Sequence, residues 1–285
     1  MRLGSAGSAQ SRLRAELIGQ LIRKDLKVKY QGSVLGFLWS LANPLLTLVV
    51  YTFVFAIVFR SDVPQFGLFL MSGLLVWNFF NMGVSGAATS VLSNAGLVKK
   101  VPFAHEALPL SAIGFAGVQV ALQYVVLLGA LIVLGRPPLR PELLLLIPAL
   151  AVVLAATVGL GMLTAAMTVR LRDTKHFLEV ALFAWMWATP IIYPASMVHE
   201  HLSSFWSWAY YLNPMAGPVV AFQRALYGQV RYPEGTGKAG ELLLPSDSAS
   251  FYLEALALSA IPAVIFLVLG VWLFRRRSAD FAEEL

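Results

Sequence analysis

The sequence has no cysteine and carries little charge for its length. With 0 Cys among 285 residues, disulfides, thiol catalysis and cysteine-based metal sites are excluded. Charged residues make up 13% of the chain and apolar residues 58%, a balance that leaves little material for a soluble globule. The composition therefore predicts one integral membrane domain over residues 1–285.

Charge is also missing from the middle of each long apolar run. A helix rises about 1.5 Å per residue, so about 20 apolar residues cross the hydrocarbon core of a bilayer. All of the runs except the fifth reach that length. They predict an all-α integral membrane protein with six transmembrane helices, at residues 35–59, 68–92, 108–134, 143–169, 177–193 and 255–274.

The lack of charge inside these runs limits the source of energy for any transport. A carrier driven by protons or ions normally keeps ionisable side chains within the membrane to bind the coupling ion. Glu179 is the one acid in any predicted span, and it lies near the start of the fifth. A secondary transporter is therefore the least favoured class, and we expect the energy to enter from outside the bilayer.

The sequence contains no arrangement of residues typical of an enzyme. His199 and His201 flank Glu200, but no further ligand lies near them, so a metal site is not expected. Residues 235–240 (GTGKAG) are similar to a phosphate-binding loop, yet the first glycine is missing at the required spacing and Ala239 replaces the Ser or Thr that would hold magnesium. We expect no catalytic residue and no cofactor, metal or ATP bound by this chain.

The distribution of basic residues predicts which side of the membrane the loops face, because Lys and Arg are more frequent on the cytoplasmic side. The larger group, expected there with both termini, is Arg2, Arg12, Arg14, Arg23, Lys24, Lys27, Lys29, Lys99, Lys100, Arg170, Arg172, Lys175 and Arg275–Arg277. The smaller group, expected outside, is Arg60, Arg136, Arg140, Arg224, Arg231 and Lys238. The net charge of +6 then reflects topology and attraction to membrane lipid. Nucleic-acid binding is not expected, because a folded basic domain is absent.

Two segments outside the spans have patterns of their own. Residues 11–30 predict an amphipathic helix on the membrane surface, since leucines recur at every fourth position from Leu13 to Leu21. Two interpretations stay open for it: a lipid-surface anchor, or a contact with a cytoplasmic partner. Residues 194–253 hold aromatic stretches too short to cross and predict re-entrant or interfacial helices at the outer end. The candidate interface residues of the 11–30 helix are Arg23, Lys24, Asp25 and Lys27.

Two patterns within the spans indicate how the helices pack. Gln119 and Gln123 share one face of the third span, and amides within membranes more often join helices by hydrogen bonds than bind substrate. Gly159 and Gly161 each have an alanine four residues away. Small residues at this spacing allow two helix backbones to approach closely.

Two inner loops are candidates for contact with a soluble partner. Residues 94–106 (NAGLVKKVPFAHE) are expected to form a small helix, and residues 170–176 (RLRDTKH) form the second loop. The alternative for both is an ordinary cytoplasmic loop whose positive charge reflects topology alone. The candidate coupling residues of the first loop are Lys99, Lys100, Pro102, Phe103, His105 and Glu106.

Short motifs follow one another along nearly the whole chain. They are residues 21–30 (LIRKDLKVKY), 33–39 (SVLGFLW), 43–45 (NPL), 73–80 (GLLVWNFF), 99–103 (KKVPF), 172–175 (RDTK), 189–194 (TPIIYP), 212–215 (LNPM) and 281–285 (FAEEL). Together they resemble the ABC-2 type permeases that export polysaccharides, including O-antigen, capsule and teichoic acid. In one departure, the family often has Tyr-Phe-Pro-Arg-Glu after the lysine pair, where residues 101–106 here read VPFAHE.

The resemblance implies a homodimer that works with two copies of a separate ABC ATP-binding subunit, which would bind ATP and magnesium. Residues 11–30 and 94–106 would contact that subunit. A lipid-linked polysaccharide would cross the bacterial inner (cytoplasmic) membrane through a channel between the two copies. Two alternatives stay open: an ABC-2 exporter of drugs or lipids, and a membrane enzyme acting on lipid-linked sugars, for which His105, Glu106 and Asp173 are the candidates.

Aromatic side chains suit the passage of a sugar chain, because a flat ring offers apolar surface without a fixed hydrogen-bond pattern. Such residues align at every fourth position in the first span and again in the fifth. The alternative is an interfacial belt or packing between helices. The candidate channel-lining aromatics are Tyr51, Phe55 and Phe59 of the first span and Phe183, Trp185, Trp187 and Tyr193 of the fifth.

Overall fold

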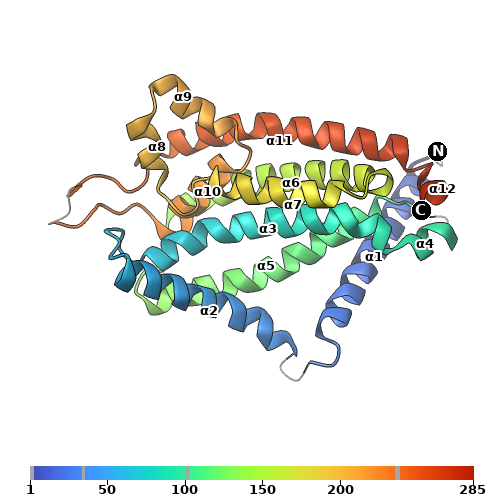
Figure 1. The fold of residues 1–285 in the computed structure, drawn as a ribbon, viewed down its shortest axis with the longest axis horizontal. Helices are drawn as coiled ribbons and strands as arrows, with labels where there is room; N and C mark the ends of the chain where they lie inside the picture. Colours follow the sequence, from blue (N-terminus) through green and yellow to red (C-terminus); the bar gives the residue numbers. More distant parts are fainter. Residues whose placement is uncertain (1–2, 34–35, 101–102, 235–237) are drawn as a thin grey trace.

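The computed structural model describes residues 3–33, 36–100, 103–234 and 238–285. Regular structure in these residues is helical, apart from one isolated antiparallel bridge between Arg231 and Leu242. The helices form an elongated bundle with both chain termini at one end (Figure 1). We call this the termini end and the other the opposite end. The predicted all-α fold is confirmed.

Five long helical stretches form most of the bundle. Within the described residues they are the helices long and apolar enough to cross a membrane, because each is an uninterrupted apolar run with its charges at the ends. Five of the six predicted spans coincide with these helices, to within a few residues at most ends. The stretches are α2 (Trp39–Phe53), which follows the 3-10 turn η1 (Gly36–Leu38) and continues as the π-helix η2 (Val54–Val58), α3 (Phe66–Ser93), α5 (Ala107–Val133), α6 (Leu146–Arg170) with the 3-10 helix η3 (Pro141–Leu145) before it, and α11 (Ala249–Arg277). Leu35, the predicted start of the first span, lies outside the described residues.

The fifth predicted span is shorter than its apolar run. Helix α7 covers Thr174–Trp187, 14 residues, or ~21 Å of rise, against about 30 Å of hydrocarbon. The predicted end at Tyr193 is wrong, because Pro190 cannot donate a helical hydrogen bond and its ring disfavours helix in the residue before it. Residues 188–194 instead form turns. A sixth crossing stays a prediction.

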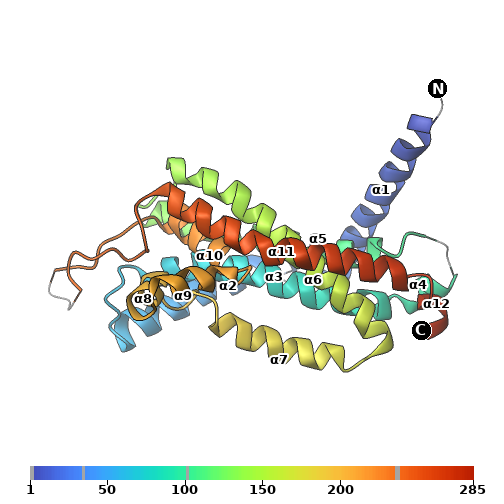
Figure 2. The same ribbon diagram turned by 90° about the horizontal axis from the view of Figure 1, so that it is seen from above.

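Helix α1 (Leu3–Tyr30) lies across the bundle at the termini end rather than along it (Figure 2). The predicted start at residue 11 is wrong by eight residues. The leucine pattern that predicted the helix begins at Leu13, but a formed helix extends into neighbouring small residues because each added residue gains one backbone hydrogen bond. Leu21 is buried while Leu13 is 66% exposed, so the apolar face contacts the bundle along the second half of the helix.

Helix α3 forms the centre of the bundle and packs against α5 and α6. A Cβ atom at Gly161 of α6 would lie 2.9 Å from the Cβ of Ala87 in α3. On the other side of α6, a Cβ at Gly159 would lie 2.3 Å from the backbone nitrogen of Leu267 in α11, and one at Gly270 would lie within bonding distance of the Gly159 carbonyl oxygen. The predicted close packing at the small residues is confirmed.

The predicted outer segment folds into short helices at the opposite end. Two of these are seated inside the bundle: each residue of α10 and η5 is buried, and the pair packs against α3, α6 and α11. Gly228 ends this stretch with a left-handed backbone (φ 84°), and its missing side chain leaves room for the Arg140 guanidinium. The short helices are α8 (Ala195–His201), α9 (Ser204–Ala209), the 3-10 turn η4 (Tyr210–Leu212), α10 (Ala216–Phe222) and the π-helix η5 (Gln223–Tyr227).

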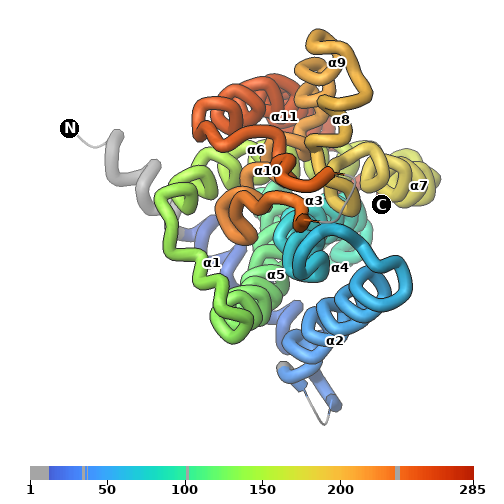
Figure 3. The backbone as a smooth tube through the Cα atoms, turned by 90° about the vertical axis from the view of Figure 1, so that its left-hand side faces the viewer, coloured from blue at the N-terminus to red at the C-terminus, as the bar shows by residue number. Residues whose placement is uncertain are grey.

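Helices α2 and α7 lie at the edge of the bundle. Viewed end-on from the opposite end, they occupy the same side of the bundle (Figure 3). In the most apolar window of the α2–η2 stretch, 11% of the residues are buried, against 78% in α3. Single apolar residues on a protein surface are ordinary, but a whole apolar helix face without cover within the chain requires lipid or another protein.

Candidate functional site

The loop between α3 and α5 forms the small helix predicted for it. Helix α4 covers Ala95–Lys100, and its first turn begins where the carbonyl of Asn94 accepts hydrogen bonds from the amides of Leu97 and Val98. Val98 points into the protein, whereas Lys99 and Lys100 are exposed. The structure therefore presents the two candidate lysines to solvent at the termini end. Pro102, another candidate, lies outside the described residues.

The rest of the candidate coupling loop contacts the C-terminal end of the chain. The Arg275 Nε atom donates a hydrogen bond of 2.7 Å to Glu106 Oε1. Nδ1 of His105 lies 3.1 Å from the carbonyl oxygen of Ser278. The ring of Phe103, which is half-buried rather than free, lies 5.3 Å from the His105 ring. Sequence reasoning missed these contacts, because they join residues about 170 positions apart.

Helix α1 meets the same loop. Lys24 donates a hydrogen bond of 3.2 Å to Asn94 Oδ1 and lies 3.7 Å from the Asp25 carboxylate. Arg23 and Lys27 are exposed beside them. The structure thus brings together the two segments, 11–30 and 94–106, that the sequence nominated separately.

A second contact fixes the end of α1 to α5. The Lys29 ammonium donates a hydrogen bond of 2.7 Å to Gln119 Oε1, and the Tyr30 hydroxyl bonds both Gln119 and Ser40. Gln119 is buried, so its amide would be unsatisfied without these partners. Gln123, one turn on, accepts a bond of 3.3 Å from the Asn78 amide of α3. Both glutamines join helices, as predicted.

The three aromatics of the first span form a continuous row. The rings of Tyr51 and Phe55 lie 6.4 Å apart, and those of Phe55 and Phe59 lie 5.4 Å apart. Phe55 also stacks on Phe66 of α3 at 4.1 Å, so it packs within the chain. Phe59 is the most exposed of the row, at 68%.

The fifth-span aromatics divide into two groups. Phe183 and Trp187 are more than half exposed. Trp185 instead donates a hydrogen bond of 2.8 Å to Asn213 Oδ1 and packs edge-on against Phe80. Tyr193 lies beyond the helix, where its hydroxyl bonds the Trp187 carbonyl oxygen at 3.1 Å. Trp185 therefore has a packing role, and two of the four candidates on this span are free to face a partner or substrate.

A groove of about 220 Å³, lined mostly by apolar surface with a few polar groups, lies between α3 and α7. Its walls include Asn81 and Ser85 of α3 and Glu179 and Phe183 of α7. Glu179, the one acid within a predicted span, is exposed and lies 3.8 Å from Lys175. Carboxylate, amide and hydroxyl groups are costly in contact with lipid tails, which cannot solvate them.

The structure reveals an ion pair that the sequence did not predict. Arg224 of η5, expected on the outer side of the membrane, has a side chain only 10% exposed and bonds the Glu142 carboxylate at 2.9 Å. Its guanidinium also lies 3.9 Å from Asp247. Nothing in the local sequence marks this burial, because the partners are 82 and 23 residues away.

The loop that is similar to a phosphate-binding motif and the histidine pair His199 and His201 both make contacts within the chain. Lys238, from the loop that is similar to a phosphate-binding motif, bonds the Glu200 carboxylate, and this hydrogen bond lowers the pKa of Glu200. His199 and His201 each contact a carbonyl oxygen of their own helix. Over the described ranges, no group of three His, Cys, Asp or Glu side chains could hold a metal ion. Gly235, Thr236 and Gly237 of the loop lie outside those ranges.

An all-helical bundle with five described helices of membrane-crossing length defines a multi-pass membrane protein. The family profile described as ABC-2 type transporter matches residues 16–227. The chain therefore belongs to the ABC-2 type transporter family, as its motifs predicted, and is a transport protein.

Three relatives are similar over almost their whole length. An O-antigen export system permease protein RfbA of Myxococcus xanthus is 30% identical, over 94% of this chain and 95% of its own. Two proteins with the same name from Klebsiella pneumoniae are 29% and 28% identical, each over 95% of both chains. The similarity covers both the bundle and the loops at its two ends.

Proposed function

We propose that this chain is the permease subunit of an ATP-driven exporter that moves a lipid-linked polysaccharide of the O-antigen or teichoic-acid type across the bacterial inner membrane. The observation that carries the proposal is the joint surface at the termini end. There, α1 and the lysine-bearing α4 meet through the Lys24–Asn94 hydrogen bond, and the family match supplies the class of transporter.

The energy comes from a separate partner. The sequence lacks a nucleotide-binding motif, so an ABC ATP-binding subunit holds ATP and magnesium and docks at the termini end. Both termini then face the cytoplasm, as the excess of basic residues there favours. Helix α7, together with the turns that follow it, serves as a short sixth crossing. The two copies of the ATP-binding subunit each act on one copy of this chain.

A second copy of this chain covers the exposed face of α2 and α7. Both helices lie on one side of the bundle (Figure 3), and exposed apolar side chains such as Phe53 and Val49 line α2. Closed pairs with two-fold symmetry are the commonest oligomers. The groove beside Glu179 lies between α3 and α7, so the same face combines apolar contact surface with a few polar groups.

The channel between the copies is lined in part by aromatics. Phe59, Phe183 and Trp187 are the exposed members of the two rows. Their flat faces contact the C–H surfaces of sugar rings, while Glu179 and Asn81 keep the path hydrated. Because stacking of this kind fixes no hydrogen-bond register, the polymer can slide past the aromatic rings.

The membrane-enzyme alternative is not favoured by the site. Its candidate groups His105 and Glu106 contact Ser278 and Arg275 of the same chain. General acid–base catalysis requires a group within hydrogen-bond reach of the substrate proton. Both groups are engaged in holding the loop in place.

The test is to purify the chain with an ABC ATP-binding subunit from the same genome and to measure ATPase activity in nanodiscs. Replacing Lys99 and Lys100 by alanine is expected to weaken co-purification and to lower ATPase activity. Lys238→Ala, at the opposite end, is the matched control and should behave as the unaltered chain. Failure of the unaltered chain to bind any ATP-binding subunit would contradict the proposal. Accumulation of a lipid or drug, rather than glycan, in a deletion strain would favour the other ABC-2 class.

A further inference from the structure

We propose that Arg275, the Ser278 carbonyl and Phe281 make the C-terminal end of the chain a positioning element of the coupling site. It holds residues 103–106 against α11, so that force applied to α4 reaches the α11–α6 pair. The inference deepens the proposed function and rests on it, because it names the route by which the ATP-binding subunit acts on the bundle. Its three parts are a polar clamp, a buried aromatic anchor and a rigid helix pair.

The polar clamp consists of two contacts on consecutive residues of the loop. Arg275 bonds Glu106 at 2.7 Å, and His105 lies 3.1 Å from the Ser278 carbonyl oxygen. The Arg275 side chain is 65% exposed, so solvent screens much of the attraction. Its contribution is geometric: the charge-assisted hydrogen bond has a preferred direction and fixes the loop relative to the last turn of α11.

The aromatic anchor is Phe281 of α12 (Phe281–Glu284). Its side chain is fully buried, and its ring lies 5.2 Å from Phe274 and 6.1 Å from His105. The same buried cluster includes Val98 of α4 and Leu21 of α1. The other residues of α12 are exposed, so Phe281 is the buried side chain of this short helix, and the partly buried Leu285 that follows it packs against the same cluster. Figure 1 shows α12 beside α4 at the termini end.

The rigid helix pair is α11 and α6, and their closest contact, at Gly270, lies one to two helical turns before Arg275. Gly270 of α11 contacts the carbonyl oxygen of Gly159 in α6 with no side chain between the backbones. Two backbones in direct contact leave no side chain whose rotation could absorb a displacement. A movement of α4 that reaches Arg275 is therefore passed on to both helices.

The experiment uses the whole complex of this chain with its ATP-binding subunit. Arg275→Ala and Phe281→Ala are expected to co-purify with that subunit at unaltered levels, while glycan export in cells falls by about tenfold. Phe281→Leu, which keeps an apolar anchor, should restore most of the export. Because Arg275 is largely exposed, its variant tests the proposal even where Phe281→Ala does not fold.

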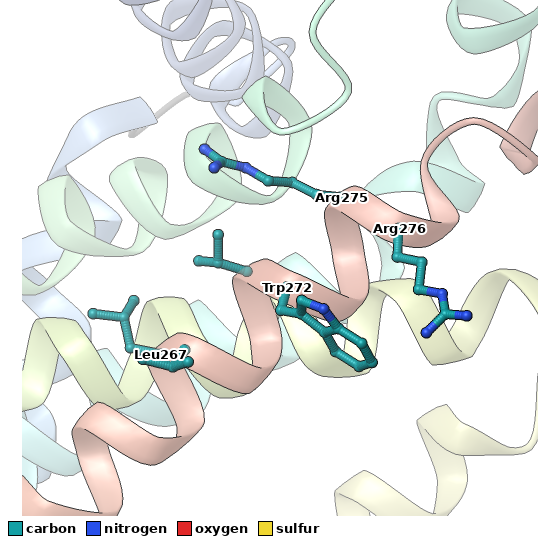
Figure 4. Close-up of a pocket in the computed structure, with 6 residues that line it drawn as sticks. Leu267, Trp272, Arg275 and Arg276 are labelled. Carbon is teal, nitrogen blue, oxygen red and sulfur yellow. The ribbon is translucent and has the colours of Figure 1, made fainter.

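The matched control is Arg276→Ala, one residue along the same helix. Its guanidinium lies 5.4 Å from the Trp272 ring and extends away from Arg275 (Figure 4). This variant should export as the unaltered chain does. If Arg275→Ala and Phe281→Ala also export normally, the clamp has no role and the inference is overturned. The proposed function would survive that result, since co-purification and ATPase activity test it separately.

A second measurement separates positioning from stability. The chain has no native cysteine, so Glu106→Cys with Arg275→Cys creates the one thiol pair on this chain, which a short bifunctional maleimide can join when the partner subunit is also free of cysteine. Before crosslinking, the double variant should transport poorly in inverted vesicles. Crosslinking should restore ATP-dependent transport. Crosslinking that leaves transport low would show that the loop must move relative to α11, contrary to the inference.

Discussion

The guanidinium of Arg224 and the carboxylate of Glu142 lie 2.9 Å apart and join the buried π-helix η5 to the short helix that precedes α6. Both groups are largely withdrawn from water, and the pair lies where the inserted segment 216–227 meets the bundle. A buried charge is stable when it is paired and hydrogen-bonded, and is costly when one partner is removed. The contact therefore determines how firmly α10 and η5 remain in place.

Removing one member of this pair should loosen the opposite end of the molecule. Glu142→Ala leaves Arg224 with a hydrogen bond of 3.2 Å to the Asp247 backbone carbonyl and the 3.9 Å approach to the Asp247 carboxylate, and we expect a loss of about 3 kcal/mol in unfolding free energy. Thermal unfolding of the detergent-solubilised protein measures it. Asp247→Asn, which removes the exposed partner at 3.9 Å, should cost much less. Equal effects of the two variants would contradict this account.

The contact of α6 with α11 predicts a steric effect at one glycine. Gly159→Leu requires the two backbones to separate, since even a Cβ would lie 2.3 Å from Leu267, and overpacking of this kind costs about 1–3 kcal/mol or more. Gly129→Ala in α5 is the control, because nothing lies within 4 Å of its position. Helix propensity alone should make that variant neutral or slightly more stable. Comparison of melting temperatures tests the pair.

Gln119 and Gln123 differ in the number of partners that each holds. Gln119→Leu removes the partner of Lys29 and one partner of Tyr30, and should lower stability by about 1–3 kcal/mol. Gln123→Leu removes the single bond to Asn78 recorded at 3.3 Å and should have the smaller effect. Limited proteolysis between α1 and α2 provides a local measurement. Faster cleavage in the Gln123 variant than in the Gln119 variant would argue against the proposed anchoring of α1.

Alanine substitutions at two neighbouring aromatics of α7 should affect different properties, export in one case and stability in the other. Phe183→Ala removes an exposed ring, so we expect normal folding with reduced export. Trp185→Ala removes a ring that bonds Asn213 and packs on Phe80, so it should destabilise the protein by about 3–5 kcal/mol. Yield after purification and export by the surviving protein distinguish the two. Full export by the Phe183 variant would remove this residue from the proposed channel lining.

The parts of the fold that follow from local pattern were predictable. Apolar run length gave five spans, and the small residues around Gly159 marked the close helix contact, because both effects act within one helix or one turn. The end of α7 was misplaced although Pro190 was visible, since run length was given more weight than backbone chemistry. The start of α1 lay outside the leucine pattern that identified the helix.

The parts that depend on distant partners could not be predicted. The burial of Arg224 needs Glu142, and the placement of His105 and Glu106 needs the end of α11. A single sequence shows which residues are charged but not which ones meet. The exposure of the two lysines of α4 follows from the sequence, because a basic pair in a loop is solvated without a distant partner; their part in coupling stays a prediction.

The bare face of α2 has a consequence for cells that carry two versions of the gene. If a pair of copies forms one channel, a variant that keeps this face but has lost the Arg275 clamp still occupies a place beside an intact copy. With equal expression and random pairing, about one quarter of the pairs would contain two intact copies. Such a variant would suppress export in the presence of the unaltered gene, whereas one that fails to fold would be harmless.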